Sequence, residues 1–151
     1  MTKANIAFYW ASSCGGCEIA VLDINEKILD VIEKANILMW PVAMDTKYED
    51  VKKMKDNSID VCFFNGAIRT SENEELAKLL RKKSKVLVAF GSCAHEGCIP
   101  ALANLFNKKL IFDRAYQETE TTVNNDNTLP QTSFMTKEGE IHIPEFYDTV
   151  K

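Results

Sequence analysis

One arrangement, which occurs twice, most constrains the fold of this chain. An apolar, strand-like run ends in a turn that carries cysteine beside glycine, and a helix-like segment follows. The first run covers residues 4–10 and leads into Cys14-Gly15-Gly16-Cys17; the second covers residues 85–90 and leads into the turn 91–98. A strand, a tight turn and a helix form the repeating unit of α/β sheets. Both cysteine turns are therefore expected at the carboxyl ends of parallel strands.

Between and after these turns, apolar runs and amphipathic segments continue to alternate. The patterning predicts, in chain order, a helix over residues 17–34, a strand over 36–44 that is bulged or at an edge because of Pro41, a helix over 48–56, a strand over 59–64, a helix opened by a Ser71/Glu74 capping box and a helix near Pro100. The order predicts an α/β fold, a flavodoxin-like open parallel sheet with helices on both faces.

Length and composition limit the classes of function. The 151 residues fit one flavodoxin-like core over residues 1–115, followed by an extended C-terminal segment over 116–151. A net charge of −4 gives no electrostatic reason to expect nucleic acid. The sequence has no apolar run long enough to span a membrane and no secretory signal pattern, so a cytoplasmic location is expected. In that compartment, five cysteines indicate metal or redox ligands before disulfides.

The candidate site consists of the cysteines at the two turns. In a flavodoxin-like strand order, the turns that carry Cys14, Cys17 and Cys93 open at the same edge of the sheet. An iron–sulfur cluster is held by cysteine thiolates, and a C-x2-C pair supplies two of them from one turn. Glycines let the backbone fold closely around such a group. The residues expected to bind the cofactor are Cys14, Gly15, Gly16, Cys17, Glu18, Gly91, Ser92 and Cys93.

Two other kinds of site remain open from the residues alone. Cys14, Cys17 and Cys93, completed by His95 or Cys98, would also suit a structural zinc ion, which predicts a zinc-stabilised binding module. A single C-x2-C motif after a strand is also typical of dithiol oxidoreductases, which predicts a redox reaction at Cys14 and Cys17. Cys62 alternates with apolar residues inside a predicted strand and is expected to be an inert core thiol.

With these motifs, the chain resembles the small subunits of nickel–iron hydrogenases, in particular the F420-non-reducing (methyl-viologen-reducing) type. The likeness lies in Cys14-Gly-Gly-Cys-Glu18, in 66–69 and in Gly91-Ser-Cys-Ala94, and related 20-kDa subunits of NADH:quinone oxidoreductases share the fold. The resemblance implies an electron-transfer subunit with a proximal [4Fe–4S] cluster on Cys14, Cys17 and Cys93. It also implies a large subunit carrying the nickel–iron centre and a further electron-carrier subunit as partners. Such a chain is part of an oxidoreductase and is not expected to be active alone.

The fourth cluster ligand departs from the family pattern. The family takes it from a later Gly-Cys-Pro-Pro-like motif, and no cysteine follows Cys98 here. We expect a chain that stops short of this motif, with the fourth ligand beyond Lys151. Cys98 is the alternative ligand, although the family often has glycine at its position. The partner is expected over the two cysteine turns, with Trp10 and Arg69 near the interface.

Overall fold

A four-stranded parallel sheet forms the centre of the computed structural model, which describes residues 2–151. Its strands are β1 (Ala4–Trp10), β2 (Ala35–Met39), β3 (Ile59–Asn65) and β4 (Ser84–Phe90). Their spatial order is β2-β1-β3-β4, with every pairing parallel. This order places β3 between the two strands that lead into the cysteine turns, as the sequence predicts.

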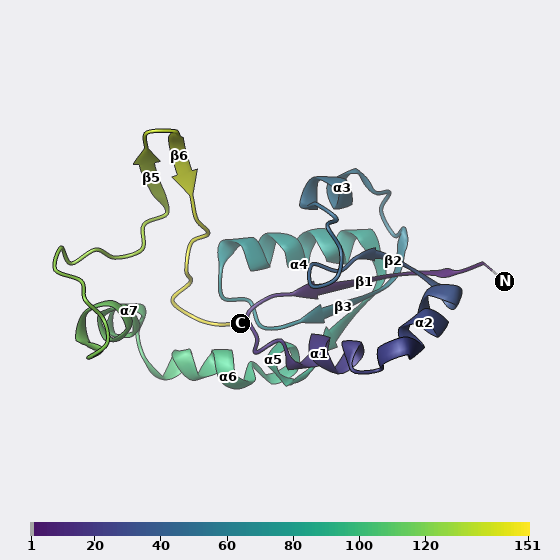
Figure 1. Cartoon of the computed structure of the whole chain (residues 1–151), viewed down its shortest axis with the longest axis horizontal. Helices are drawn as coiled ribbons and strands as arrows, with labels where there is room; N and C mark the ends of the chain where they lie inside the picture. The colour runs from purple at the N-terminus through teal and green to yellow at the C-terminus, as the bar shows by residue number, and fades with distance from the viewer. Residues whose placement is uncertain (1) are drawn as a thin grey trace.

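Helices cover both faces of the sheet (Figure 1). On one face lie α3 (Tyr48–Lys53) and α4 (Ser71–Lys83). On the other face lie α1 (Gly16–Leu22), α2 (Ile28–Lys34) and α5 (Ser92–Glu96). The predicted α/β class with a flavodoxin-like parallel sheet is therefore confirmed.

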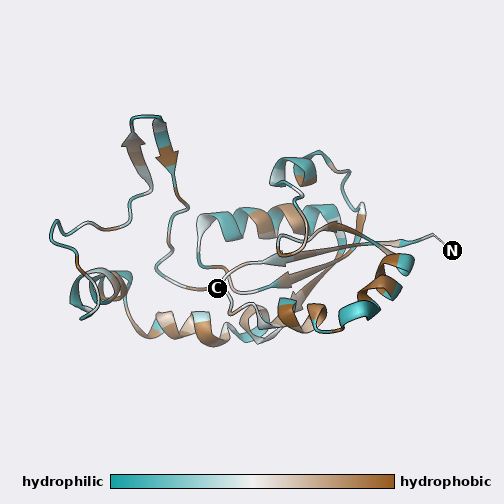
Figure 2. Ribbon diagram, in the orientation of Figure 1, coloured by the Kyte–Doolittle hydropathy of each residue, from teal (hydrophilic) through white to brown (hydrophobic). Residues whose placement is uncertain are grey.

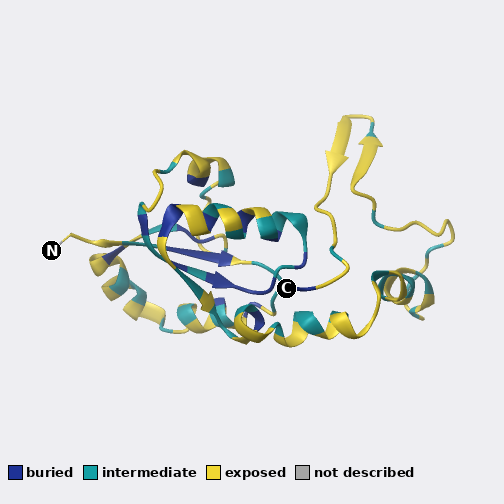
Figure 3. Cartoon of the chain, turned by 180° about the vertical axis from the view of Figure 1, so that it is seen from behind, coloured by how far each residue is buried: buried dark blue, intermediate teal, exposed yellow. Residues whose placement is uncertain are grey.

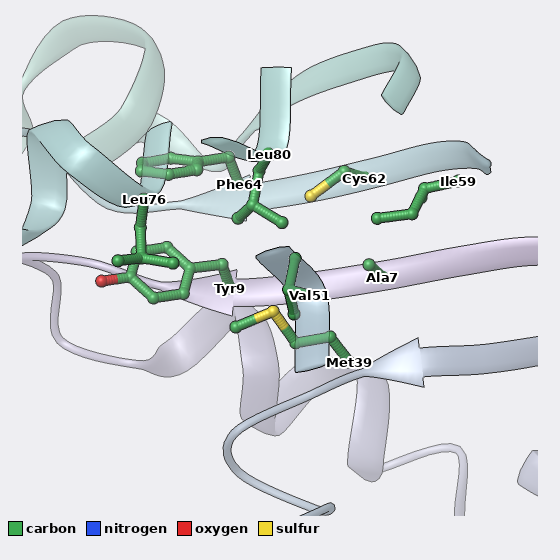
Figure 4. Close-up of a cluster of buried hydrophobic side chains, with 9 residues drawn as sticks. All are labelled: Ala7, Tyr9, Met39, Val51, Ile59, Cys62, Phe64, Leu76 and Leu80. Atoms are coloured by element: carbon green, nitrogen blue, oxygen red, sulfur yellow. The ribbon is translucent and has the colours of Figure 1, made fainter. Parts of the chain in front are cut away.

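The main core lies between the sheet and the helices α3 and α4 (Figure 4). Alternate strand residues point to this side, so Tyr9 of β1 and Cys62 of β3 pack with Leu80 of α4. Cys62 and Leu80 have no solvent exposure, and Tyr9 is almost fully buried. The core fixes the strand register, and through it the positions of the loops at the carboxyl ends of the strands.

The helix predicted over residues 17–34 is wrong as one element. It is broken into α1, a 3-10 turn (Asn25–Lys27) and α2. Asn25 has a left-handed φ of 52°, and its side-chain amide donates to the Asp23 carbonyl oxygen at 2.9 Å. Asparagine tolerates this conformation better than most residues, so the chain turns here although apolar residues continue at helical spacing.

Three other predicted boundaries differ from the structure. The strand predicted over 36–44 ends at Met39, because the Trp40 carbonyl accepts from Ala43 and Met44 N–H in a turn; β2 is nevertheless an edge strand, as Pro41 suggested. Helix α3 ends at Lys53 instead of 56. The capping box of α4 uses Thr70 and Asn73 instead of Ser71 and Glu74, one residue earlier.

After α5 the chain leaves the sheet as an arm (Figure 1). It continues through α6 (Cys98–Ala101), a 3-10 turn (Leu102–Leu105), α7 (Lys108–Asp113), a π-helical turn (Arg114–Glu118) and a hairpin of β5 (Ser133–Thr136) and β6 (Gly139–His142). Apolar side chains along α6 and the following turn are largely exposed (Figures 2 and 3), with Leu105 at 73%. The helix expected near Pro100 is thus present but short.

The last residues return to the sheet. Residues 145–151 pair with the loop after β3: Ser71 N–H donates to the Glu145 carbonyl at 3.0 Å, and Ile68 and Lys151 exchange backbone hydrogen bonds of 2.8 and 3.0 Å. We call residues 145–151 the return segment. Within residues 2–151, none of the helices has the length and apolar character needed to cross a bilayer.

Candidate functional site

The loops that follow β1 and β3 are joined at the carboxyl edge of the sheet. Ala11 N–H donates to the Asn65 carbonyl oxygen at 2.7 Å, and Ser12 and Ala67 exchange backbone hydrogen bonds of 3.2 and 2.9 Å. Gly66 permits this approach, because its φ is +104° and a Cβ there would lie 2.8 Å from the Ala11 carbonyl carbon. The turn that carries Cys14 is thereby held at the end of β3.

The turn after β4 touches the first cysteine turn. A Cβ on Gly91 would lie only 2.2 Å from the Cys17 sulfur, and Gly91 has a φ of +85°. Cys17 is the second residue of α1, and Cys93 lies in the first turn of α5. The two turns that carry the predicted ligands therefore touch at one rim of the sheet.

Four cysteines line this rim, and they differ in exposure. Cys14 and Cys98 are exposed, Cys17 is partly buried and Cys93 is 7% exposed; all are free thiols. Burial raises the pKa of the Cys93 thiol above its ordinary value, partly offset by a hydrogen bond from the Cys14 backbone. The pKa of the Cys98 thiol is lowered. The Ser92 hydroxyl has the largest lowering effect, and the Ile99 N–H and Cys93 have smaller ones.

The kind of donor at the rim fits an iron–sulfur group better than a hard cation. The four candidate ligands are sulfur atoms, which suit iron–sulfur clusters and zinc, whereas oxygen ligands suit magnesium and calcium. His95 is exposed, and its Nδ1 lies 3.4 Å from the Glu96 carboxylate. In the described part of the chain, no three Cys, His, Asp or Glu side chains are yet arranged to chelate an ion. Binding would therefore require the thiols to rotate towards one another.

Glu18, predicted beside the cofactor, points into the protein. Its side chain is fully buried, and one carboxylate oxygen accepts a hydrogen bond from Nε1 of Trp40, the residue that follows β2. Burial raises the pKa of this carboxyl, while the hydrogen bond from Trp40 opposes the shift. Its second oxygen has no hydrogen-bond partner among the described residues. In this structure Glu18 anchors the start of α1 to β2.

Two further residues predicted near the partner interface, Trp10 and Arg69, differ in exposure. Trp10 is 42% exposed, and its ring packs on Gly15, where a Cβ would lie 2.4 Å from the ring. Arg69 is 8% exposed, with its guanidinium stacked 5.2 Å from the Phe146 ring centroid of the return segment. The resemblance gave no signal for Phe146, because this contact joins residues that are far apart in the sequence.

The return segment is the part of the site region that sequence reasoning missed. Asn104 holds it by accepting from Val150 N–H at 2.8 Å and donating to the Val150 carbonyl at 2.9 Å. Tyr147 N–H donates to the Arg69 carbonyl at 3.0 Å. Residues 116–151 therefore do not remain wholly extended from the core. No periodic pattern in the sequence marks these contacts, which depend on single polar side chains.

A family model described as NADH ubiquinone oxidoreductase, 20 Kd subunit, matches residues 14–137. The chain is 42% identical to the iron-sulfur subunit of the F420-non-reducing hydrogenase of Archaeoglobus profundus, over 97% of this chain and 46% of that relative. It is 37% identical to an F420-non-reducing hydrogenase subunit of Methanothermobacter thermautotrophicus, over 92% of this chain and 44% of that relative. The chain thus spans less than half the length of these curated relatives.

More distant comparisons agree on the fold. The chain is 28% identical to the delta subunit of the NAD-reducing hydrogenase HoxS of Cupriavidus necator, over 80% of this chain and 54% of that relative. A crystal structure of an NAD+-reducing [NiFe]-hydrogenase in the H2-reduced state superposes with a TM-score of 0.78 at 22% identity, covering 99% of this chain and 74% of that one.

A parallel sheet with cysteine turns at its carboxyl rim, together with the matching model, defines the class: the chain belongs to the NADH ubiquinone oxidoreductase 20 Kd subunit family. Within this family it is similar to the small subunits of F420-non-reducing hydrogenases, as the sequence motifs predicted.

Proposed function

We propose that this chain is an electron-transfer subunit of a nickel–iron hydrogenase-type complex. Cys14, Cys17 and Cys93 would hold a [4Fe–4S] cluster, which supplies reversible one-electron transfer when bound. The observation that carries the proposal is the contact between the two cysteine turns, where Gly91 leaves just enough room for the Cys17 sulfur. The printed description of the Archaeoglobus profundus relative, an iron-sulfur subunit, supports the same assignment.

The residues around the thiols have distinct tasks in this proposal. Gly15 and Gly91, both at positive φ, keep side-chain bulk away from the cluster position. The Gly16 N–H lies 3.5 Å from the Cys14 sulfur, and Ser92 directly precedes Cys93, so both supply polar groups beside the proposed ligands. Glu18 holds α1 against Trp40 and so fixes the direction of Cys17.

The rim also provides the surface for the proposed partner. Trp10, Ile99 and Leu102 expose large apolar side chains at or next to the cysteine turns, at 42%, 60% and 58%. Exposed apolar residues that gather around a site are typical of protein–protein contacts. We place a large subunit with the nickel–iron centre over this rim, since electron transfer requires closely spaced centres, and a further electron-carrier subunit beyond it. The complex is proposed to work in the cytoplasm, where free thiols are kept reduced.

The complex itself provides the test. The chain is co-expressed with a nickel–iron large subunit, and reduction of a viologen dye by H2 is measured in the purified complex. Cys17→Ser should lower the rate at least about tenfold while the large subunit still co-purifies, because the substitution removes a ligand on the electron path. His142→Ala, in the exposed β6 strand, is the control and should leave the rate unchanged.

Two outcomes would contradict the proposal. Full H2-dependent activity in the Cys17→Ser complex would remove this cysteine from the electron path. Tight, colourless zinc in the purified chain, with no uptake of iron, would instead support the structural zinc site that the same four sulfurs could form.

A further inference from the structure

Arg69 is a buried cation without a counter-ion in its own chain. It lies in the loop after β3, directly before the Thr70 N-cap of α4, and only 8% of its surface is exposed. Its Nη1 is buried without a hydrogen-bond partner, and within residues 2–151 no carboxylate forms an ion pair with the guanidinium. A buried charge is costly unless it is paired, so this arginine requires an explanation.

Two carboxylates on the adjoining elements pair with other groups instead. Glu74, in the first turn of α4, accepts from the Tyr147 hydroxyl and lies 3.1 Å from Lys78 Nζ. Asp148 of the return segment lies 3.3 Å from Lys108 Nζ. The amino end of α4 also carries a partial positive charge, which adds to the cost of a cation beside it. The surroundings of Arg69 therefore favour an anion from outside the chain.

An aromatic contact fixes the guanidinium but does not satisfy its donors. The Arg69 guanidinium carbon lies 5.2 Å from the Phe146 ring centroid, and Phe146 packs edge-on against Phe112 of α7 at 5.8 Å. The Tyr147 N–H donates to the Arg69 carbonyl at 3.0 Å and holds the return segment alongside. An aromatic face attracts a cation, yet it offers no acceptor in the guanidinium plane. A carboxylate matches that planar fork with two hydrogen bonds.

We propose that Arg69 binds a carboxylate side chain, aspartate or glutamate, of the large subunit. The inference rests on the proposed function, which places that subunit over the rim. The loop of Arg69 is continuous with the rim, because Ala67 exchanges backbone hydrogen bonds with Ser12, two residues before Cys14. On binding, the carboxylate accepts from the guanidinium N–H groups and neutralises the buried charge, and no covalent bond is made or broken.

The free chain gives the first test, because it does not depend on a partner. Arg69→Gln removes the charge and keeps an amide donor, so its thermal midpoint should equal or exceed that of wild type. Arg81→Gln is the matched control: the Arg81 guanidinium donates to the Ser84 and Lys85 carbonyls at 2.7 and 3.1 Å, so its midpoint should fall. An equal fall in Arg69→Gln would show that Arg69 stabilises the chain itself, and would overturn the proposal.

The second test uses the complex with the nickel–iron large subunit. The dissociation constant of the co-expressed complex is measured by dilution for wild type and variants. Arg69→Gln should raise it at least about tenfold, because the partner's carboxylate is left buried and unpaired. Arg69→Lys keeps the charge but loses the planar fork, so its dissociation constant should be intermediate. Arg81→Gln should assemble like wild type, since Arg81 lies at the end of α4 away from the rim.

The outcomes distinguish this inference from the proposed function. If the Arg69→Gln complex dissociates like wild type, no partner carboxylate binds here, and the proposed function still stands. If the wild-type chain does not associate with a nickel–iron large subunit, the proposed function fails and this inference fails with it.

Discussion

The two ends of the parallel sheet are built from different chemistry. At the amino end, charged and amide side chains pair with one another: Lys83 Nζ lies 3.0 Å from Asp56, and Lys85 Nζ lies 2.6 Å from Asp60. At the carboxyl end, free thiols and glycines at positive φ lie in the turns. The charged groups at the amino end pair within the chain, whereas the carboxyl end presents free thiols. Ion pairs thus stabilise one end, and the proposed binding site lies at the other.

The largest expected contrast is in thiol reactivity between the rim and the sheet interior. Burial raises the pKa of Cys62 to about 12, so hardly any thiolate exists there near neutral pH. Exposed Cys14 and Cys98 should react with iodoacetamide at pH 8 at least about 100-fold faster than Cys62 in the cluster-free chain. Peptide mapping by mass spectrometry measures the rates. Rapid labelling of Cys62 in folded protein would contradict the buried position.

Gly91→Ala tests the close approach at the rim. The added methyl group would meet the Cys17 sulfur at 2.2 Å in a left-handed backbone, so the free energy of unfolding should fall by about 1–3 kcal/mol. Gly139→Ala is the matched control: its φ is +135°, yet nothing lies within 4 Å of the new Cβ. Denaturant unfolding compares the two variants. Equal losses would mean that backbone strain alone, without the contact to Cys17, explains the effect.

Lys83→Ala tests the amino end. The buried ammonium donates to the Met54 carbonyl at 2.6 Å and to Asp56 at 3.0 Å, so its loss should cost about 1–2 kcal/mol of unfolding free energy. Lys82→Ala, whose exposed ammonium lies 3.6 Å from the same carboxylate, should cost less than about 0.5 kcal/mol. Iron uptake should be unchanged in both variants. Lower uptake in folded Lys83→Ala would contradict the separation of the two ends.

The smallest effect is expected from Asp56→Asn. Hydrogen bonding from Lys83 and the charges of Lys82 and Lys83 lower the pKa of Asp56 below its ordinary value of 3.8. The carboxylate therefore stabilises the fold above pH 3.8, and this contribution is lost as the pH falls through the lowered pKa. Thermal midpoints of wild type and variant should differ slightly at pH 7 and converge in acid. A difference that grows with acidification would have the wrong sign.

The strands and the rim could be predicted from the sequence, because apolar runs and cysteine–glycine turns are local signals. The break at Asn25 could not, since the apolar spacing continues through a turn that one asparagine makes. The N-cap of α4 was predicted one residue too late, at Ser71 instead of Thr70, because both residue types can cap a helix. The burial of Arg69 depends on Phe146, and only tertiary structure brings these residues together.

The central claim is that the two cysteine turns hold one iron–sulfur group. The most direct measurement is anaerobic reconstitution of the chain and of Cys17→Ser and Cys93→Ser, with iron, sulfide and EPR determined for each. The account predicts uptake of iron and sulfide by the wild-type chain, and loss of the same EPR signal in each variant. An unchanged signal in Cys93→Ser, with loss only in Cys17→Ser, would contradict a shared site.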